Sequence, residues 1–494
     1  MPTQRAANRS LPFLLGSAAV MLVAALGCVL FLSNYLNYAA ESISLASLLR
    51  IAEGKSYVGS LDGLPQYWNP YSPYLAWILT PVIRLLRLAT PEQVALTGRL
   101  IVVAIFGVYS LLVRRFFRAH HLNEYDGRCH TLALLWVMLL FLSNLTAIRP
   151  DLLSFLAEFA SFSLLFRYLF SPGSPRFSLV VLAGVAAGVA IAVKLNTVGG
   201  VAGLSLFLLA ERKGRSAALY VTCIALTAAA LLLVNYAIYG PKMMLDWLSI
   251  LTSTGFTGVG LVRRGLQVVD EIGVGNLLLV ALATWGLLTI HLERPREAKL
   301  YACFLGGSVL VATVGQSKIG AASNYYIGAF VLATIPLSIG LRRLFDPTCD
   351  GAAARSLRFV LYLLWPVLLL KAAVLPVNIL LNERPYYHYD EVKSMIARDY
   401  PGATIYTPEE SAAVHFHTRV LLGPWTEQIL TLSDAYSRKL PAIRRALADR
   451  GFTLAVVPGS GCESWEPHGL FKAETEPLRR LIHKNGKICV FARR

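Results

Sequence analysis

The sequence predicts a polytopic α-helical membrane protein with about eleven transmembrane helices and a small soluble α/β domain at its C-terminus. The first observation is composition: 55% of the 494 residues are hydrophobic and 15% are charged, whereas soluble domains carry about 25% charged residues. The second is a series of apolar runs, many approaching the roughly 20 residues that a bilayer core requires. The third is a polar segment after the last run. Together they disfavour a soluble enzyme, a disordered chain and a disulfide-rich secreted module.

The apolar runs define eleven candidate spans. The first is long for a signal peptide and no clear cleavage site follows it. The stretch 71–90 is also apolar, but prolines and arginines interrupt it, and counting it would change the total. The expected spans are residues 11–32, 92–113, 131–148, 151–170, 178–193, 196–210, 216–238, 274–291, 299–314, 324–341 and 357–380.

Basic residues alternate between the two ends of these spans. The chain has 46 lysines and arginines against 29 acidic residues, a formal charge of +17. No nucleic-acid-binding signature accompanies this surplus, so we expect no nucleic-acid partner. A cytoplasmic N-terminus places most loop cations in the cytoplasm, as is usual for membrane proteins. An odd span count then places the C-terminal segment outside, and the short outer loops contain chiefly Arg149, Lys194, Lys242 and Lys318.

Residues 383–494 form the second of two predicted domains, after a transmembrane domain of residues 1–382. The segment has 16 basic and 13 acidic residues, and strand and helix patterns alternate along it, as in a small α/β domain. No glycine-rich phosphate loop opens its helices, so nucleotide binding is not indicated. The expected strands are 404–407, 419–422, 453–457 and 488–491, and the expected helices are 388–399 and 436–450.

The seven cysteines show no spacing suited to a zinc site. Most lie in or beside apolar segments, where cysteine is usually a small hydrophobic residue. Cys462 and Cys489 lie in the polar C-terminal segment. They would pair in an oxidising compartment or remain free in a reducing one.

The first outer loop, residues 34–91, is too long for a simple connection. Residues 41–53 form a predicted amphipathic helix with Ser44, Ser47 and Arg50 on its polar face, and such a helix lies in the membrane interface. The following segment 67–74 is rich in aromatic residues and proline. It is either an aromatic belt or a platform for a sugar ring or lipid headgroup.

Two acidic residues lie near the expected outer surface. Glu41 occupies the first turn of the predicted helix, where an acid complements the helix dipole or, if partly desolvated, serves as a general base. Asp151 belongs to the sequence Arg149-Pro150-Asp151. Proline and aspartate are a common helix start, whereas arginine binds phosphate in a bidentate manner. In that second interpretation, Asp151 holds a metal or orients Glu41.

Two further polar segments, around Lys194 and around Lys318, interrupt the outer ends of later spans. Lysines near a helix end often extend to the headgroup layer without any other role. Together with Glu41 and Arg149, however, they outline a pocket for a phosphate-containing lipid. A channel would more often place such residues in the middle of its spans.

The order of these features resembles that of the GT-C superfamily of membrane glycosyltransferases. The similarity is to the bacterial, family 39-like branch that includes protein mannosyltransferases and aminoarabinose transferases. Each motif is weak alone, but their order covers most of the membrane region. The motifs are Glu41 after the first span, Tyr57, Asn69-Pro-Tyr71-Ser-Pro73, Arg149-Pro-Asp151, Lys194 and Gly320-Ala-Ala-Ser-Asn324-Tyr325.

The resemblance implies an inverting hexosyl- or pentosyltransferase of the bacterial inner membrane. Its donor would be a polyprenyl-phosphate sugar, and its acceptor a lipid, glycan or protein that arrives from the outer side. Glu41 would be the general base and Asp151 the second catalytic carboxylate. The leaving phosphate would be stabilised by Arg149, Lys194 and Lys318, and the remaining substrate-binding residues would be Tyr57, Asn69, Tyr71, Asn324 and Tyr325.

The chain departs from this family in its first acidic motif. Many relatives carry an Asp-Glu pair, whereas here Ala40 precedes Glu41 and Ser42 follows it. A lone carboxylate is a poor ligand set for a divalent cation. We therefore expect no obligatory cofactor and do not favour a metal ion.

Two other functions remain open at this point. A transporter or flippase of a lipid-linked saccharide would show internal repeats and broken helices that meet at the midplane, and the sequence shows no convincing repeat. A polysaccharide ligase or polymerase would have its large loop later in the chain. The segment 240–273 is the comparable stretch, and it could line an acceptor entrance.

Overall fold

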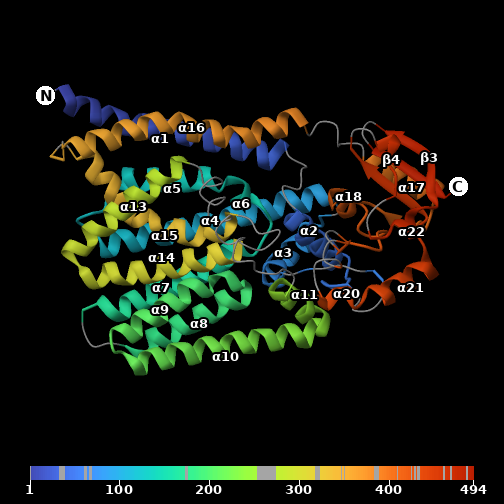
Figure 1. Cartoon of the computed structure of the whole chain (residues 1–494), viewed down its shortest axis with the longest axis horizontal. Helices are drawn as coiled ribbons and strands as arrows, with labels where there is room; N and C mark the ends of the chain where they lie inside the picture. Colours follow the sequence, from blue (N-terminus) through green and yellow to red (C-terminus); the bar gives the residue numbers. More distant parts are fainter. Residues whose placement is uncertain are drawn as a thin grey trace.

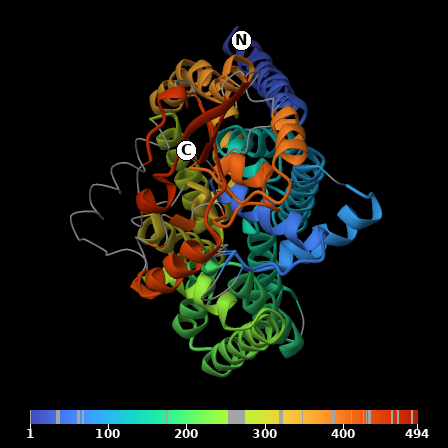
Figure 2. The same ribbon diagram turned by 90° about the vertical axis from the view of Figure 1, so that its right-hand side faces the viewer.

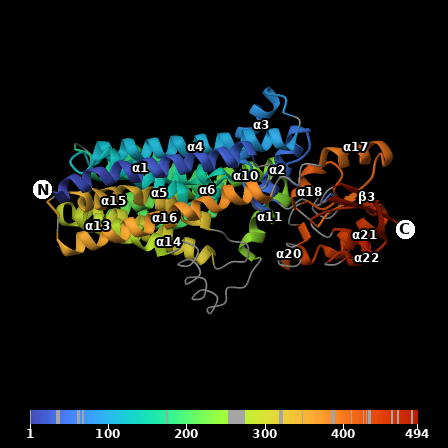
Figure 3. The ribbon, with the colours of Figure 1, turned by 90° about the horizontal axis from the view of Figure 1, so that it is seen from above.

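The computed structural model shows an elongated helical bundle with a small sheet-containing region at one end (Figure 1). The N-terminus lies at the opposite end of the long axis, along which the long helices run (Figure 3). The structure describes residues 2–32, 39–59, 64–65, 69, 71–88, 90–172, 176–252, 274–316, 323–346, 348–349, 351–382, 389–408, 410–423, 426–427, 430, 434–459, 462–467, 470–485 and 488–493.

Each of the eleven expected spans coincides with helix. The third is divided, because α5 ends at Leu140 and a short helix follows it before Arg149. The helices are α1 (Pro2–Gly27) with the π-helical turn η1 (Cys28–Leu32), α4 (Pro91–His120), α5 (Gly127–Leu140) with α6 (Leu142–Thr146), α7 (Asp151–Phe170), α8 (Phe177–Val193), η2 (Leu195–Thr197) with α9 (Val198–Ala210), α10 (Gly214–Tyr239), α13 (Val274–Glu293), α14 (Pro295–Gln316), η3 (Ser323–Tyr326) with α15 (Ile327–Phe345), and α16 (Ala352–Asn382).

The exposed surface of the helical bundle is apolar and therefore suited to contact with lipid. Among the residues that the structure describes, seven helices, namely α1, α4, α7, α10, α14, α15 and α16, are long and apolar enough to cross a membrane, and α3 (Tyr74–Leu85), α5, α8, α9 and α13 are shorter apolar helices. Large apolar side chains such as Leu233 and Leu370 are about 70% exposed (67% and 70%). Apolar surface of this kind is stable in hydrocarbon and costly in water. The chain is a multi-pass membrane protein, as predicted.

Glycines allow two of these helices to approach closely. A Cβ atom at Gly199 of α9 would overlap the carbonyl oxygen of Gly307 in α14, and one at Gly203 would overlap that of Cys303. Small residues at such spacing are typical of tightly packed membrane helices. This packing places η2, which precedes α9, beside the end of α14 and therefore near η3.

The first outer loop forms α2 (Ala39–Ala52) and α3 (Tyr74–Leu85). Both lie at the end of the bundle next to the C-terminal region (Figure 1). Residues 41–50 of α2 are all buried, because α3, α4 and the C-terminal helix α18 (Glu410–His415) pack around it. The predicted helix is confirmed, but protein rather than water covers its polar face.

The C-terminal region contains a four-stranded sheet of order β1-β2-β4-β3. β1 (Ile405–Tyr406) is parallel to β2 (Leu454–Pro458), whereas β4 (Ile488–Arg493) is antiparallel to both β2 and β3 (Leu478–Asn485). Three expected strands are confirmed. The fourth, 419–422, makes an isolated bridge at Val420, and β3 was not expected because its exposed face carries many charges. The helices are α17 (Tyr389–Asp399), α18, α20 (Asp434–Ser437), α21 (Leu440–Arg450) and α22 (Lys472–Thr475).

A disulfide and two contacts between a histidine and an acid hold this region. Cys462 and Cys489 are bonded, so the paired alternative is the one that the structure shows. His417 contacts Glu53 at 2.6 Å, and His415 lies 3.3 Å from Glu92 at the start of α4. Figure 2, which looks onto this end, shows the C-terminal region in front of the bundle. The division into separate domains at residue 382 stays a prediction.

Candidate active site

Four chain segments meet at the end of the bundle beneath the C-terminal region. They are the start of α7, the end of α8, the loop before α3, and η3. From these segments the structure brings together five predicted residues: Tyr71, Arg149, Asp151, Lys194 and Tyr325. We call this group the cation cluster. Residues that are far apart in the sequence therefore lie together at one end of the bundle.

Asp151 is the acid at the centre of the cation cluster. It is the first residue of α7, after Pro150. Its Oδ1 accepts a hydrogen bond from the Lys194 ammonium, and its Oδ2 lies 3.5 Å from Nε of Arg149. Arg149 also donates to Oδ1 of Asn144 at 2.6 Å. All three charged groups are largely buried, so one carboxylate holds two cations away from water.

Two tyrosine rings cover the Lys194 ammonium. Its Nζ lies 5.6 Å from the centre of the Tyr71 ring and 5.2 Å from that of Tyr325. Cations are attracted to aromatic faces at such distances. Burial raises the pKa of the Tyr71 phenol, an effect that the nearby Arg149 opposes. The ring therefore presents a neutral hydroxyl beside the cations at physiological pH.

Hydrogen bonds hold the loop that carries Tyr71. The Ser72 hydroxyl donates to the carbonyl oxygen of Val193 at 2.8 Å, next to Lys194. Oδ1 of Asn69 accepts from the backbone N–H of Tyr71 at 3.0 Å, and its amide donates to Ser47 of α2. The Tyr57 hydroxyl lies 3.5 Å from the carbonyl oxygens of Tyr71 and Ser72. Asn69 and Tyr57 thus contact the loop backbone rather than the cations.

Glu41 lies beside this cluster but has a different partner. Arg99 of α4 donates from Nε to Oε1 and from Nη2 to Oε2 of Glu41, both at 3.0 Å. The backbone N–H of Ile148 donates to the same Oε1 at 3.3 Å. Glu41 is fully buried. It therefore joins α2, α4 and the residue just before Arg149, and places positions 41 and 149 on one side of the membrane.

The structure does not describe the side chains of two predicted site residues, Lys318 and Asn324. Lys318 lies outside the described residues. Asn324 is in η3, but its side chain is among those of which the structure describes no placement; the neighbouring Tyr325 does reach Lys194. The structure thus leaves both roles as predictions.

The sequence interpretation missed Arg99 and Asn144. Arg99 had a usable signal, since an arginine within an expected span needs a buried acid as its partner. Asn144 had a weaker one, as a polar residue five positions before Arg149 in a run counted as membrane-spanning. Neither could be assigned a partner without knowing which helices are neighbours.

Two adjoining cavities open beside the first outer loop. One, of about 340 Å³, is lined by Tyr57, Trp77 and Tyr239 among others. The other, of about 600 Å³, lies between the loop and the C-terminal region and includes Arg50, His417 and Arg419 in its lining. Lys55 and Ser56 line both. An aromatic cavity thus adjoins a basic one near the cation cluster.

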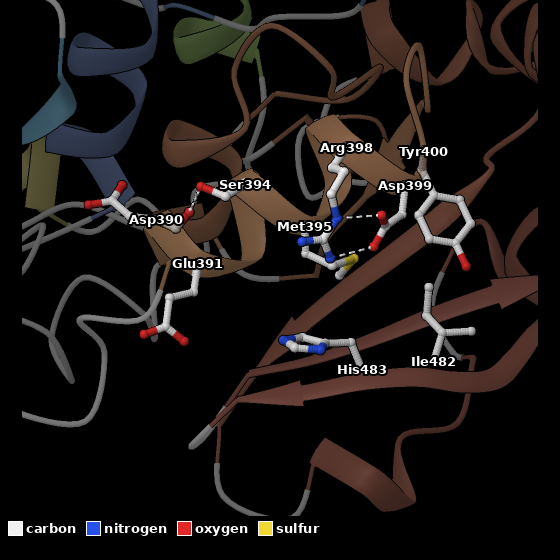
Figure 4. Close-up of a pocket in the computed structure, with 9 residues that line it drawn as sticks. All are labelled: Asp390, Glu391, Ser394, Met395, Arg398, Asp399, Tyr400, Ile482 and His483. Atoms are coloured by element: carbon white, nitrogen blue, oxygen red, sulfur yellow. Dashed lines mark hydrogen bonds and ion pairs between the residues drawn. The ribbon is translucent and has the colours of Figure 1, made fainter.

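A third cavity, of about 770 Å³, lies between α17 and β3 in the C-terminal region (Figure 4). Its acids include Asp390 and Asp399, and Arg398 forms a bidentate pair with Asp399 at 2.6 and 2.9 Å. His483 of β3 extends towards this group. It contains no residue of the predicted site.

One group of residues has metal-ligand composition among the described residues. The ligand atoms of Cys462, Glu463 and Cys489 lie within 4.8 Å of one another. Both sulfur atoms belong to the disulfide, however, and Glu463 pairs with Lys484. Thiolate is the form that binds a metal, so this group is unsuited to one.

Solved structures share this architecture. ArnT from Cupriavidus metallidurans bound to undecaprenyl phosphate matches with a TM-score of 0.61 at 14% identity, over 97% of this chain and 98% of that chain. Its apo form gives 0.60 at 14% identity, over 99% and 98%. An oligosaccharyltransferase from Archaeoglobus fulgidus in the apo form gives 0.52 at 11% identity, over 90% of this chain and 69% of that one.

These matches confirm the predicted GT-C fold over nearly the whole chain. No protein-family model and no curated protein sequence matches it. At this level of identity the similarity concerns the fold, and the activity must be argued from the site.

Proposed function

We propose that this protein is a membrane glycosyltransferase that moves a sugar from a polyprenyl-phosphate donor to an acceptor on the outer face, with inversion. The cation cluster carries the proposal. Arg149 and Lys194 lie together beside the carboxylate of Asp151 in a largely buried site. A guanidinium and an ammonium are the groups that bind phosphate oxygens in proteins, so this pair of cations suits a lipid phosphate headgroup. The match to ArnT with bound undecaprenyl phosphate supports the same donor class.

The proposed roles follow from the contacts. Arg149 and Lys194 stabilise the negative charge that develops on the leaving phosphate, a strong effect where water is excluded. Asp151 holds the two cations together until the phosphate arrives. Tyr71 and Tyr325 keep the Lys194 ammonium in place. The leaving group stays in the membrane, so the reaction needs no nucleotide pocket.

We propose Glu41 as the base that accepts the proton of the acceptor hydroxyl. Oε1 already accepts hydrogen bonds from Arg99 and Ile148, and an oxygen has two lone pairs. Proton transfer therefore uses Oε2, after Arg99 moves away from it. Asp151 is the second candidate, because it lies inside the cation cluster.

The acceptor is proposed to enter through the two cavities that share Lys55 and Ser56, since they open between the first loop and the C-terminal region. The disulfide supports an extracytoplasmic position for that region, because such bonds persist in oxidising compartments. We place the N-terminus in the cytoplasm and the protein in a bacterial inner membrane.

The direct test uses purified full-length protein in lipid nanodiscs. It is supplied with undecaprenyl-phosphate sugars, both hexoses and pentoses, and with a native membrane fraction as the acceptor source. We expect release of undecaprenyl phosphate and transfer of labelled sugar, both abolished by Arg149→Ala. Movement of the intact donor across a bilayer without bond cleavage would instead identify a flippase and overturn the proposal.

A further inference from the structure

A further buried ion pair, besides those of Asp151 and Glu41, lies between the cation cluster and the C-terminal region. It is on α11 (Pro241–Thr252), a short helix after α10. Lys242 and Asp246 are four residues apart on this helix and pair with each other. Both side chains are almost fully buried, at 3% and 0% exposed. A buried ion pair contributes little stability over apolar packing, so stability alone does not account for it.

One side of this pair contacts the loop of the cation cluster. Oδ2 of Asp246 accepts a hydrogen bond from the backbone N–H of Asn69 at 3.0 Å. The side chain of the same Asn69 accepts from the backbone N–H of Tyr71, whose ring covers Lys194. Two hydrogen bonds thus connect Asp246 to the residue that touches the cation.

The other side contacts the C-terminal region. The Lys242 ammonium donates to the hydroxyl of Tyr436 at 2.6 Å and lies 5.0 Å from the centre of its ring. Tyr436 belongs to α20, is 1% exposed, and packs in the apolar core of the C-terminal region. Figure 1 shows α11 and α20 side by side where the bundle meets that region.

We propose that Lys242 and Asp246 are positioning residues that let the C-terminal region set the place of Tyr71 at the cation cluster. The chain of contacts runs from Tyr436 through the ion pair and Asn69 to Tyr71. When the C-terminal region is docked, the chain fixes Tyr71 over Lys194 and completes the headgroup site. This inference rests on the proposed function for its kinetic consequence, but its structural consequence can be measured independently.

Two variants each remove one contact from the series that connects Tyr436 to Tyr71. Asp246→Asn removes the charge at nearly constant size, and Tyr436→Phe removes the hydroxyl that Lys242 contacts. Tyr406→Phe is the matched control, because it removes another buried tyrosine hydroxyl of the same region, which contacts Glu427 rather than α11. All are made in the full-length chain in nanodiscs.

We expect Asp246→Asn to raise the KM for the undecaprenyl-phosphate sugar by ~10-fold, the size of effect that loss of a charged hydrogen bond gives. We expect Tyr436→Phe to raise it by ~3-fold, in line with loss of a weaker hydrogen bond. The value of kcat should change less than threefold, because neither residue touches the reacting atoms. The double variant should resemble Asp246→Asn alone, since links of one chain are not additive. Equal KM values in these variants and the Tyr406→Phe control would overturn the inference.

Exchanging the two charges of the ion pair distinguishes a positioning role of Asp246 from a contribution to stability alone. In Lys242→Asp with Asp246→Lys, the helix keeps an ion pair, but the N–H of Asn69 faces an ammonium that cannot accept its hydrogen bond. We expect a folded protein with a raised donor KM. A wild-type KM in this variant would show that the ion pair alone matters.

Hydrogen exchange provides the readout that does not depend on activity. We expect faster exchange of the backbone amides of Asn69 and Tyr71 in Asp246→Asn and Tyr436→Phe, and wild-type exchange in Tyr406→Phe. If the wild type transfers no sugar but these amides lose protection, the proposed function fails and the link stands. If transfer is normal and protection is unchanged in all variants, the link fails and the function stands.

Discussion

The end of the bundle beside the C-terminal region contains two buried acids whose charged neighbours differ. Glu41 meets one arginine, Arg99, with both oxygens, and the two charges cancel. Asp151 meets two cations, Arg149 and Lys194. The first arrangement suits a joint between helices. The second brings a guanidinium and an ammonium together, which is the pair that we propose for the donor phosphate.

Burial of a charged residue does not by itself mark a functional site. Both acids are at most 2% exposed, and both lie where a carboxylate was predicted to act. The balance of the surrounding charges distinguishes them. Variants that change this balance test the distinction.

The largest effect is expected from Arg149→Ala. Loss of a positioned cation at a developing negative charge typically lowers kcat by roughly 10²–10³-fold. The measurement is sugar release from the labelled donor, with undecaprenyl phosphate binding followed by thermal shift. Arg296→Ala is the control, since that arginine pairs with Glu211, which follows the last residue of α9 and lies outside the cluster. Comparable loss in both variants would mean that the cluster has no special role.

The second-largest effect is expected when the pair formed by Glu41 and Arg99 is broken. Glu41→Leu alone should destabilise the protein by about 3–5 kcal/mol, since it leaves Arg99 buried without its partner. Glu41→Leu with Arg99→Met should recover most of that loss in a denaturation experiment.

The double variant decides what Glu41 does. If Glu41 is the base, the recovered protein remains inactive in sugar transfer. If it recovers activity together with stability, Glu41 only joins helices and Asp151 becomes the remaining carboxylate for the role of base. Asp151→Asn, assayed in parallel, should be inactive in the second case.

A smaller effect is expected for the ring of Tyr325, one of the two that cover Lys194. Tyr325→Phe keeps the aromatic face and should leave the donor KM within about twofold of wild type. Tyr325→Leu removes it and should raise KM roughly 5-fold, in line with about 1 kcal/mol for a cation–π contact. Equal KM values for the two variants would indicate that the ring only fills space.

The sequence predicts the frame of this site well and its pairings poorly. The spans, α2 and the shared side of Arg149, Lys194 and Tyr325 follow from hydropathy and loop charge, which are properties of local sequence. The partner of Glu41 does not, because it depends on α4 packing beside α2. The same limit applies to Asp246, which the sequence places in a loop near an acceptor entrance and the structure places against Asn69.

The smallest effect concerns that third buried carboxylate, Asp246, and its dependence on pH. Burial raises its pKa to about 6, against the effects of Lys242 and the N–H of Asn69. Two tyrosines also border the pair: Tyr436 of α20 accepts a hydrogen bond from Lys242, and burial raises the pKa of Tyr57 of the first loop, which stays neutral near pH 6. The charged form that holds Lys242 is therefore populated above pH 6 and lost as the pH falls through that value. The Asp246→Asn variant is neutral at position 246 at every pH and so imitates the protonated form of Asp246. The measurement is the kcat/KM for the donor in the wild type divided by that in the variant. This ratio should fall from ~10 at pH 7.5 to ~3 at pH 5.5, because less of the wild type carries the charge at the lower pH. A ratio that stays constant over this range would mean that the charge of Asp246 does not contribute, and that its hydrogen bond to Asn69 acts through geometry alone.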